Sequence, residues 1–267
     1  MTEDQRKEWD LIIDKIPLDG PLNMAVDDYL FQSLTKEPRT YLRFYMWRRP
    51  AASIGYSQKI QEVVNVEYCQ KQNIDIVRRM TGGKLVLHSN EVTYSLCSSD
   101  ISTFTSTLVD SYRLISEALI NGLEKMTLKP RLAESPPDTY LRGNLPCFSY
   151  PAQNEIEIGG NKIIGSAQRR IGANFIQHGS IPLENEQDKL KSISFLKEAE
   201  DNVRMISLSQ ALGKKVSFEW VVDLLKAGFS EYFNIGLKRK RLDENENKAV
   251  LQIIKERYGN RDWTYLR

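Results

Sequence analysis

Two cations, two adjacent glycines and a histidine stand among apolar residues in the stretch Arg78-Arg79-Met80-Thr81-Gly82-Gly83-Lys84-Leu85-Val86-Leu87-His88. Residues 74–77 before it and 92–96 after it are rich in β-branched residues, so both are predicted to be strands, with the glycine pair turning the chain between them. Glycine lets backbone N–H groups approach a bound anion because no Cβ stands in the way. The stretch is therefore either a ligand-binding loop or an ordinary hairpin with two surface arginines, and the rest of the chain has to decide.

Around this stretch, the hydrophobic pattern predicts intermixed strands and helices. A Gly-Gly pair within 154–170 is predicted to close a β-hairpin. Apolar residues recur at intervals of three and four between 108 and 123, which is typical of a long amphipathic helix. Further strands are expected at 9–13, 41–47, 52–56 and 173–181, and further helices at 23–31, with Asn23 as N-cap, at 60–72 and over most of the chain after 188. Strand-to-strand turns outnumber long crossovers, so the sequence predicts an α+β fold with a mixed or antiparallel central sheet flanked by helices.

The composition is that of a globular protein. The chain has 267 residues, of which 41% are hydrophobic and 27% charged, and no apolar run is long enough for a membrane span. Its charged amino terminus lacks the features of a signal sequence, so we expect a cytoplasmic protein. The net charge of +2 does not indicate a nucleic-acid binder. The local basic run 238–241 is either a solvated face or a docking patch for an acidic protein.

The cysteines and histidines do not indicate a metal site. Three cysteines are widely spaced without a Cys-x-x-Cys pair, the only histidines are His88 and His178, and no metal is expected. Cys147 follows a proline in a turn-rich loop where a thiol can be reached, whereas Cys69 and Cys97 lie on an apparent helix and strand. A lone cysteine is more often a small buried hydrophobic residue than a nucleophile, because a nucleophilic thiol needs a nearby positive charge or base.

Lys162 is the cation that most suggests such a partner for Cys147. It follows the Gly-Gly turn of the predicted hairpin and precedes Gly165-Ser166-Ala167. The alternative interpretation is that Lys162 is a solvent-exposed lysine of an ordinary hairpin.

Four motifs stand out along the chain: Asn23-Met24-Ala25-Val26-Asp27, residues 78–88 with Val92-Thr93-Tyr94-Ser95, Gly160-Asn161-Lys162-Ile163-Ile164-Gly165-Ser166-Ala167-Gln168-Arg169-Arg170, and Gln177-His178-Gly179-Ser180. Through these motifs the chain resembles a known family, the biotin/lipoate protein ligase and lipoyl/octanoyl transferase superfamily. The resemblance spans nearly all of the chain. Pro146-Cys147-Phe148 ahead of the lysine hairpin looks like the octanoyltransferase branch typified by Gram-positive bacteria.

The resemblance implies a two-step acyl transfer. Cys147 would attack the thioester of octanoyl-acyl carrier protein, and a lysine of a lipoyl-domain protein, such as glycine cleavage H protein or a 2-oxoacid dehydrogenase E2, would then take the acyl group as an amide. Lys162 would lie along the acyl carbonyl and favour both thiolate and oxyanion. The family's ligand-binding positions correspond to Arg78, Thr81, Gly82, Gly83, His88, Gly165, Ser166, Ala167 and His178. Apolar burial, worth about 0.8 kcal/mol per methylene, would recognise the octanoyl chain.

Two alternatives stay open beside the transferase. A lipoate–protein ligase would activate free lipoate with ATP and Mg²⁺ to an adenylate, and Cys147 would then be incidental. Lys84, at a position more often glycine or arginine in the family, adds a cation that suits an anionic ligand and keeps the ligase open. A binding protein that has kept the fold without activity is the third reading, against which the intact lysine, glycines and cysteine speak.

Further expectations concern the cofactor, the domains, the oligomeric state and the docking of the carrier protein. The transferase reading requires no cofactor. We expect residues 1–235 to form the catalytic domain and 236–267 a C-terminal helical extension packed on it. The polar helices after residue 188 show no dimer seam, so we expect a monomer. The basic run 238–241, together with Arg169 and Arg170, would dock the acidic acyl carrier protein.

Overall fold

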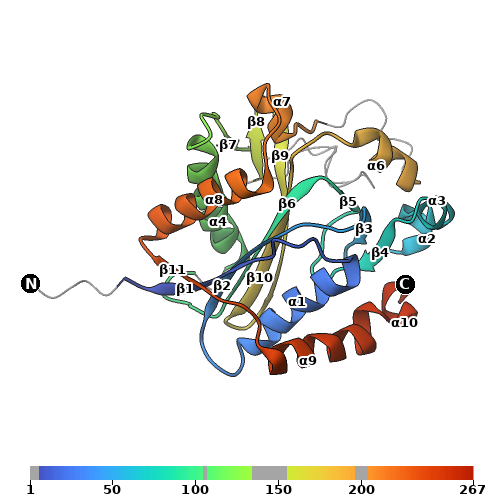
Figure 1. Ribbon diagram of the computed structural model, residues 1–267, viewed down its shortest axis with the longest axis horizontal. Helices are drawn as coiled ribbons and strands as arrows, with labels where there is room; N and C mark the ends of the chain where they lie inside the picture. Colours follow the sequence, from blue (N-terminus) through green and yellow to red (C-terminus); the bar gives the residue numbers. More distant parts are fainter. Residues whose placement is uncertain (1–5, 105–106, 134–154, 196–203, 267) are drawn as a thin grey trace, which may run out of the picture.

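The computed structural model describes residues 6–104, 107–133, 155–195 and 204–266. Its largest element is a mixed eight-stranded sheet with the order β11-β1-β2-β6-β10-β9-β8-β7 (Figure 1). The strands are β1 (Glu8–Ile13), β2 (Thr40–Tyr45), β6 (Glu91–Ser98), β7 (Arg131–Leu132), β8 (Ile156–Ile158), β9 (Asn161–Ile171), β10 (Asn174–Pro182) and β11 (Gly236–Arg239). β1 runs parallel to β2 and β11, and the other neighbours are antiparallel. The predicted α+β class with a mixed sheet is confirmed.

A second sheet of three strands lies beside the first and has the order β4-β3-β5. It consists of β3 (Ala51–Ile54), β4 (Asp75–Arg78) and β5 (Val86–His88). The predicted hairpin between 74–77 and 92–96 is wrong, because β4 pairs with β3 while residues 92–96 belong to β6 of the large sheet. The stretch from Arg78 to His88 therefore carries the chain from one sheet to the other through a loop and β5, with the glycine pair inside that loop.

Helices cover both faces of the large sheet (Figure 1). α4 (Leu108–Glu124) and α8 (Phe218–Phe233) pack on one face and against each other. Their crossing is close, since a Cβ on Gly228 would lie 2.4 Å from the backbone nitrogen of Gly122. α1 (Gly20–Ser33) and α9 (Glu244–Ile253) cover part of the other face. The remaining helices are α2 (Ile60–Val63), α3 (Val66–Lys71), α6 (Gln187–Ile193), α7 (Leu208–Leu212), the π-helix η2 (Ile254–Tyr258) and α10 (Arg261–Thr264).

Three local expectations differ from the structure. Asn23 is not an N-cap: α1 begins at Gly20, and the Asn23 side chain donates instead to the carbonyls of Leu18 and Met46. Residues 60–72 form two short helices rather than one. The chain after residue 188 also contains β11, which pairs with β1 and joins the C-terminal segment to the large sheet. The domain boundary at residue 235 stays a prediction.

No helix within the described ranges is both long and apolar enough to cross a membrane.

Candidate active site

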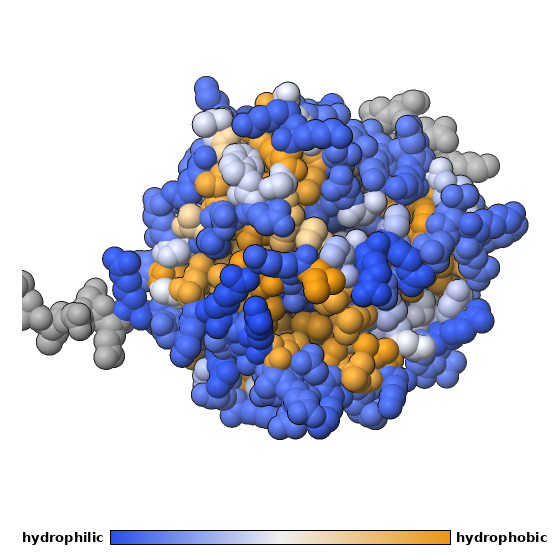
Figure 2. Space-filling view, viewed as in Figure 1, coloured by the Kyte–Doolittle hydropathy of each residue, from blue (hydrophilic) through white to orange (hydrophobic). Residues whose placement is uncertain are grey.

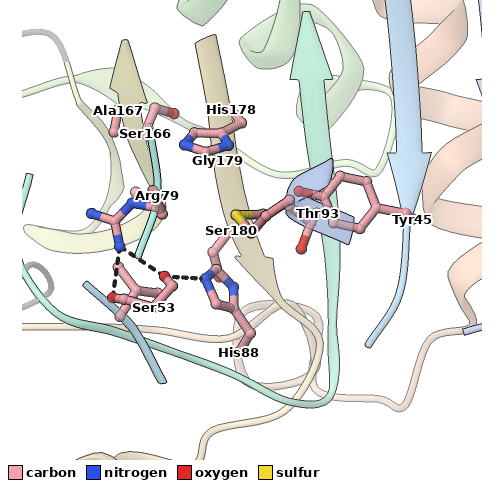
Figure 3. A pocket seen from close by; sticks show the side chains of 13 residues that line it. Tyr45, Ser53, Arg79, His88, Thr93, Ser166, Ala167, His178, Gly179 and Ser180 are labelled. Atoms are coloured by element: carbon pink, nitrogen blue, oxygen red, sulfur yellow. Dashed lines mark hydrogen bonds between the residues drawn. The ribbon is translucent and has the colours of Figure 1, made fainter. Parts of the chain in front are cut away.

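A cavity that opens to solvent lies between the two sheets, with an empty volume of about 360 Å³ when the open solvent is included (Figure 3). The large sheet and the small sheet supply most of its wall, α1 adds Met24, and the loop after β4 adds Arg79. The lining residues are Met24, Tyr45, Ser53, Arg79, Val86, His88, Thr93, Gly165, Ser166, Ala167, His178, Gly179 and Ser180. The strand register explains this gathering, because Gly165, Ser180, Thr93 and Tyr45 lie opposite one another in one row across β9, β10, β6 and β2.

A first buried network lies beneath one side of this wall and ends at the carboxylate of Glu91. Ser53 Oγ lies 2.7 Å from His88 Nε2, and His88 Nδ1 lies 2.8 Å from Glu91 Oε1. Arg79 donates to Ser53 Oγ at 2.7 Å, and Nδ1 of His88 is the donor to Glu91 because a carboxylate only accepts. Thr93 and Ser180 also donate to Glu91. Figure 3 shows Arg79, Ser53 and His88 joined at one side of the cavity.

A second buried network ends at the carboxylate of Asp27 on α1. Arg43 donates to its Oδ1 at 2.7 Å, Tyr45 donates to its Oδ2 at 3.0 Å, and His178 Nδ1 lies 3.3 Å from Oδ2. Burial alone would raise the pKa of Asp27, but the charge of Arg43 and the contacts with His178 outweigh it, so this pKa lies below its ordinary value. Burial lowers the pKa of His178, against the opposing effect of Asp27. Neutral His178 then accepts a hydrogen bond from Thr81 Oγ1 at 2.7 Å.

Together the two carboxylates change what the cavity presents to a ligand. The hydroxyl protons of Tyr45, Thr93 and Ser180 all point to Asp27 or Glu91 rather than into the cavity. A polar group whose hydrogen bonds are satisfied in the wall offers little to a ligand, so the cavity is more apolar than its residue types indicate. It suits an aliphatic chain.

The two neighbouring arginines of the 78–88 stretch have different positions. Arg79 lines the cavity, and it also donates to the carbonyls of Gly82 and Lys84. Arg78 is not among the lining residues. Its fully buried guanidinium donates to backbone carbonyls in residues 55–58 and 263–264, at distances between 2.6 and 3.2 Å. Arg78 thus holds the C-terminal helix α10 against residues 55–58. Its predicted role in ligand binding stays a prediction.

The glycine loop is held close to the small sheet. A Cβ on Gly55 would lie 2.0 Å from the carbonyl oxygen of Gly83, so only glycine permits this approach. Gly83 has a φ of 92°, in the left-handed region that favours glycine. A Cβ on Gly83 would lie 3.6 Å from Cβ of Ala167, which places the loop against the strand that lines the cavity.

Lys162 is fully buried on β9, where its Nζ lies 2.6 Å from Glu155 Oε1. It is therefore not the solvated hairpin lysine of the alternative reading. Ile156 pairs with Ile164 but Glu157 pairs with Lys162, so β9 contains one extra residue, a β-bulge at Ile163. Because paired residues share a face of the sheet, the bulge places Lys162 on the same face as Gly165 and Ala167, which line the cavity. Without the bulge Lys162 would face the opposite side.

Neither of the two described cysteines is suited to nucleophilic attack. Cys69 and Cys97 are free and fully buried. Burial raises the pKa of Cys69 to about 11 and that of Cys97 well above its ordinary value, so both stay thiols at neutral pH. Cys147 lies outside the described residues.

Of the predicted binding residues, the structure brings together His88, Gly165, Ser166, Ala167 and His178 on the cavity wall, with Thr81 and the glycine pair next to it. Sequence patterns alone assign no role to Asp27, Ser53, Arg79 or Glu91, which hold the wall in place. In the sequence Asp27 belongs only to the motif 23–27. The one feature that could have pointed to its role is that a carboxylate stands among the apolar residues of a predicted helix. Within the described ranges no group of His, Cys, Asp and Glu side chains is arranged to hold a metal ion.

Comparison with known proteins agrees with this geometry. A family model described as the lipoyl protein ligase A/B catalytic domain matches residues 19–230. The chain belongs to this family. Two curated members named Octanoyltransferase LipM resemble it over nearly their whole length. The protein from Carboxydothermus hydrogenoformans is 35% identical over 95% of this chain and 97% of its own, and that from Bacillus subtilis is 30% identical over 98% of this chain and 100% of its own.

Solved structures show that the fold is shared with the ligases of the family. A lipoate-protein ligase A bound with ATP has a TM-score of 0.83 at 24% identity and covers 97% of this chain and 98% of its own. A bipartite lipoate protein ligase from Thermoplasma acidophilum, described together with its E2 lipoyl domain, has a TM-score of 0.81 at 23% identity and covers 98% of each chain. At these identities the likeness concerns the fold.

Proposed function

We propose that this chain transfers an octanoyl group from octanoyl-acyl carrier protein to the lysine of a lipoyl-domain protein, through a thioester on Cys147. The relatives named octanoyltransferases support the reaction. The observation that carries it in this chain is the cavity whose wall hydroxyls donate to buried Asp27 and Glu91, because such a wall binds an eight-carbon aliphatic chain without competing polar groups.

The proposed chemistry has two steps. The Cys147 thiol gives up its proton, and the thiolate attacks the octanoyl thioester. The C–S bond to Cys147 forms, the C–S bond to the carrier breaks, and the carrier's thiolate takes up the proton and leaves as a thiol. The acceptor amine then attacks the same carbonyl carbon, a C–N bond forms, the bond to Cys147 breaks, and the amine's proton passes to the departing thiolate. The buried charge of Lys162 would stabilise the oxyanion in both steps, which is worth more in a dry site than in water.

The reaction as proposed uses no metal and no cofactor, takes place in the cytoplasm and is carried out by a monomer. The ligase alternative requires a site for an anionic adenylate. Arg79, the cation on the cavity wall, already donates to Ser53 and to two carbonyls, which favours the transferase.

The basic run 238–241 is proposed to dock the acyl carrier protein. A groove is lined by the cations Arg239, Lys240, Arg241 and Lys15, by one carboxylate, Asp14, and by the apolar residues Ile13, Ile16 and Leu18. Figure 2 shows apolar side chains gathered beside strongly hydrophilic ones on the face that carries α1 and β1. Arg169 and Arg170 are not among the residues that line this groove, and they donate to Met80 and Ser111. Charge reversal of 238–241 should raise the KM for the carrier, and an unchanged KM at low salt would contradict this docking site.

The proposed function is tested by intact-protein mass spectrometry after incubation with octanoyl-acyl carrier protein in the absence of ATP. We expect a hydroxylamine-labile octanoyl adduct on the native chain and on Cys69→Ala, the matched control, and no adduct on Cys147→Ala. Lys162→Met should slow adduct formation by about 100-fold, the scale of removing one oxyanion donor. Lack of an adduct, together with ATP-dependent lipoylation of an acceptor domain by Cys147→Ala, would establish the ligase instead.

A further inference from the structure

A second cavity, also with an empty volume of about 360 Å³, lies beside the first one along the same face of the large sheet. Glu91 joins the two, since it lines the second cavity while its carboxylate accepts hydrogen bonds from Thr93 and Ser180 in the wall of the first. The second cavity has no part in the chemistry described so far.

The strand register places this second cavity next to Lys162. Pro182, which lines it, pairs with Glu91, two residues along from the Ser180–Thr93 pair of the first cavity. The bulge in β9 places Lys162 on this same face of the sheet. Met205, another lining residue, lies directly beside Lys162, because the backbone nitrogen of Lys162 donates to Arg204 O at 2.7 Å and Ile206 N donates to Lys162 O at 3.0 Å. Paired residues share a face of a sheet, so the Lys162 side chain lies beside Met205 at the edge of the second cavity.

The lining of the second cavity differs from that of the first. The apolar part of the lining consists of Leu87, Pro182, Leu190 and Met205. The lining also contains Glu184 and Glu186, whose carboxylates are partly exposed. None of its described lining residues is Lys, Arg or His. Apolar walls with carboxylates suit a side chain that has an aliphatic stem and a cationic head, and they disfavour a nucleotide.

We propose that this second cavity receives the side chain of the acceptor lysine. The proposal rests on the proposed function, and adds where the second substrate enters. The octanoyl chain occupies the first cavity, and the acceptor stem lies between Leu87 and Met205, beside Lys162. The acceptor ammonium gives one proton to solvent and then attacks as the neutral amine.

Two lysines already contact the carboxylates of this cavity. Lys189 pairs with Glu186, and Lys215 pairs with Glu184 at 3.6 Å. Lys215 is 90% exposed, and such surface pairs contribute little free energy, so an arriving ammonium can replace it.

The test separates loading of the enzyme from its discharge. Octanoyl-enzyme is prepared from the native chain, from the double variant Glu184→Gln/Glu186→Gln, and from Glu67→Gln, a control on α3 whose carboxylate also pairs with a lysine. Each is then mixed with a lipoyl domain below saturation or with hydroxylamine, a neutral nucleophile. We expect the double variant to lose at least fivefold in discharge by the lipoyl domain, with unchanged discharge by hydroxylamine and unchanged loading. A bulky variant, Met205→Trp, should show the same selective loss.

The outcomes are distinct. Unchanged discharge of both variants by the lipoyl domain would overturn the proposed lysine site while leaving the proposed function intact. Slower loading from octanoyl-acyl carrier protein with normal discharge would assign the cavity to the donor's arm and would also overturn it. If the native chain forms no octanoyl-enzyme, the proposed function fails, and this inference fails with it.

Discussion

The two faces of the large sheet both carry buried residues but are built differently. On the face under α4 and α8, the core is a continuous apolar cluster that includes Phe44, Leu96, Leu119 and Phe229. On the face under α1 and the small sheet, the buried residues include charged Asp27, Arg43 and Glu91. The first face stabilises the fold by removing apolar surface from water, whereas the second holds charges that are buried at a cost and positioned by one another. The comparison shows that the cavity lies on the face of the sheet where buried charges hold one another in position.

The largest expected effect on stability comes from removing one charge of the buried network on the charged face. Arg43 is fully buried and pairs with Asp14 and Asp27, so Arg43→Met leaves Asp27 as an uncompensated buried charge. We expect a loss of about 3–5 kcal/mol in the free energy of unfolding, measured by urea denaturation. The control Arg39→Met removes an exposed pair with Glu37 and should cost no more than about 1 kcal/mol. Equal losses in the two variants would show that the buried network contributes no more to the free energy of unfolding than an exposed ion pair does.

A substitution that creates a cavity on the apolar face should lower the free energy of unfolding slightly less, and it should leave acylation of the enzyme unchanged. Leu119 is fully buried on α4, so Leu119→Ala is expected to lower the free energy of unfolding by about 3 kcal/mol. The control Leu251→Ala, at a position 55% exposed, should change it by less than about 0.5 kcal/mol. The yield of octanoyl-enzyme per folded molecule should stay the same in both. A selective loss of acylation in Leu119→Ala would mean that the two faces are coupled.

How much of this contrast the sequence predicts depends on the kind of interaction. The strands and the long helix of the apolar face follow from periodicity, because spacing alone tells which side chains share a face. The charged face does not follow, since the partners of Asp27 come from positions 43, 45, 95 and 178, and no local pattern joins them. Likewise the bulge that turns Lys162 toward the cavity depends on pairing between strands, and the different positions of Arg78 and Arg79 depend on packing against residues 263–264.

Filling the first cavity should shorten the preferred acyl chain. Ala167→Leu adds three carbons to the lining of the cavity, which excludes about three methylenes of the substrate and costs about 2 kcal/mol for octanoyl. We expect the ratio of octanoyl to hexanoyl loading, followed by mass spectrometry, to fall at least tenfold. Ala173→Leu, in the exposed turn between β9 and β10, is the matched control and should leave the ratio unchanged. An unaltered ratio in Ala167→Leu would exclude this cavity as the acyl site.

The smallest expected effect is a dependence of stability on pH that comes from the charged face. Burial lowers the pKa of His178, whose ring is faced by Asp27, Thr81, Arg79 and His88. The unfolded chain, with an ordinary histidine pKa near 6.5, binds a proton before the folded chain does. His178 therefore favours unfolding as the pH falls below about 6.5, by at most about 1.4 kcal/mol per pH unit. His178→Asn should remove this part of the slope in urea denaturation between pH 7 and 5, and an equally steep slope in that variant would contradict the assignment.

The most direct test of the central claim is a single-turnover chase without ATP. Purified octanoyl-enzyme, freed of carrier protein, is mixed with a lipoyl domain, and both proteins are weighed by mass spectrometry over time. The account predicts that the enzyme loses its octanoyl group at the rate at which the domain gains it as a hydroxylamine-stable amide, and that Cys147→Ala carries out neither step. Octanoylation of the domain only when ATP and free octanoate are supplied, and equally by Cys147→Ala, would contradict it.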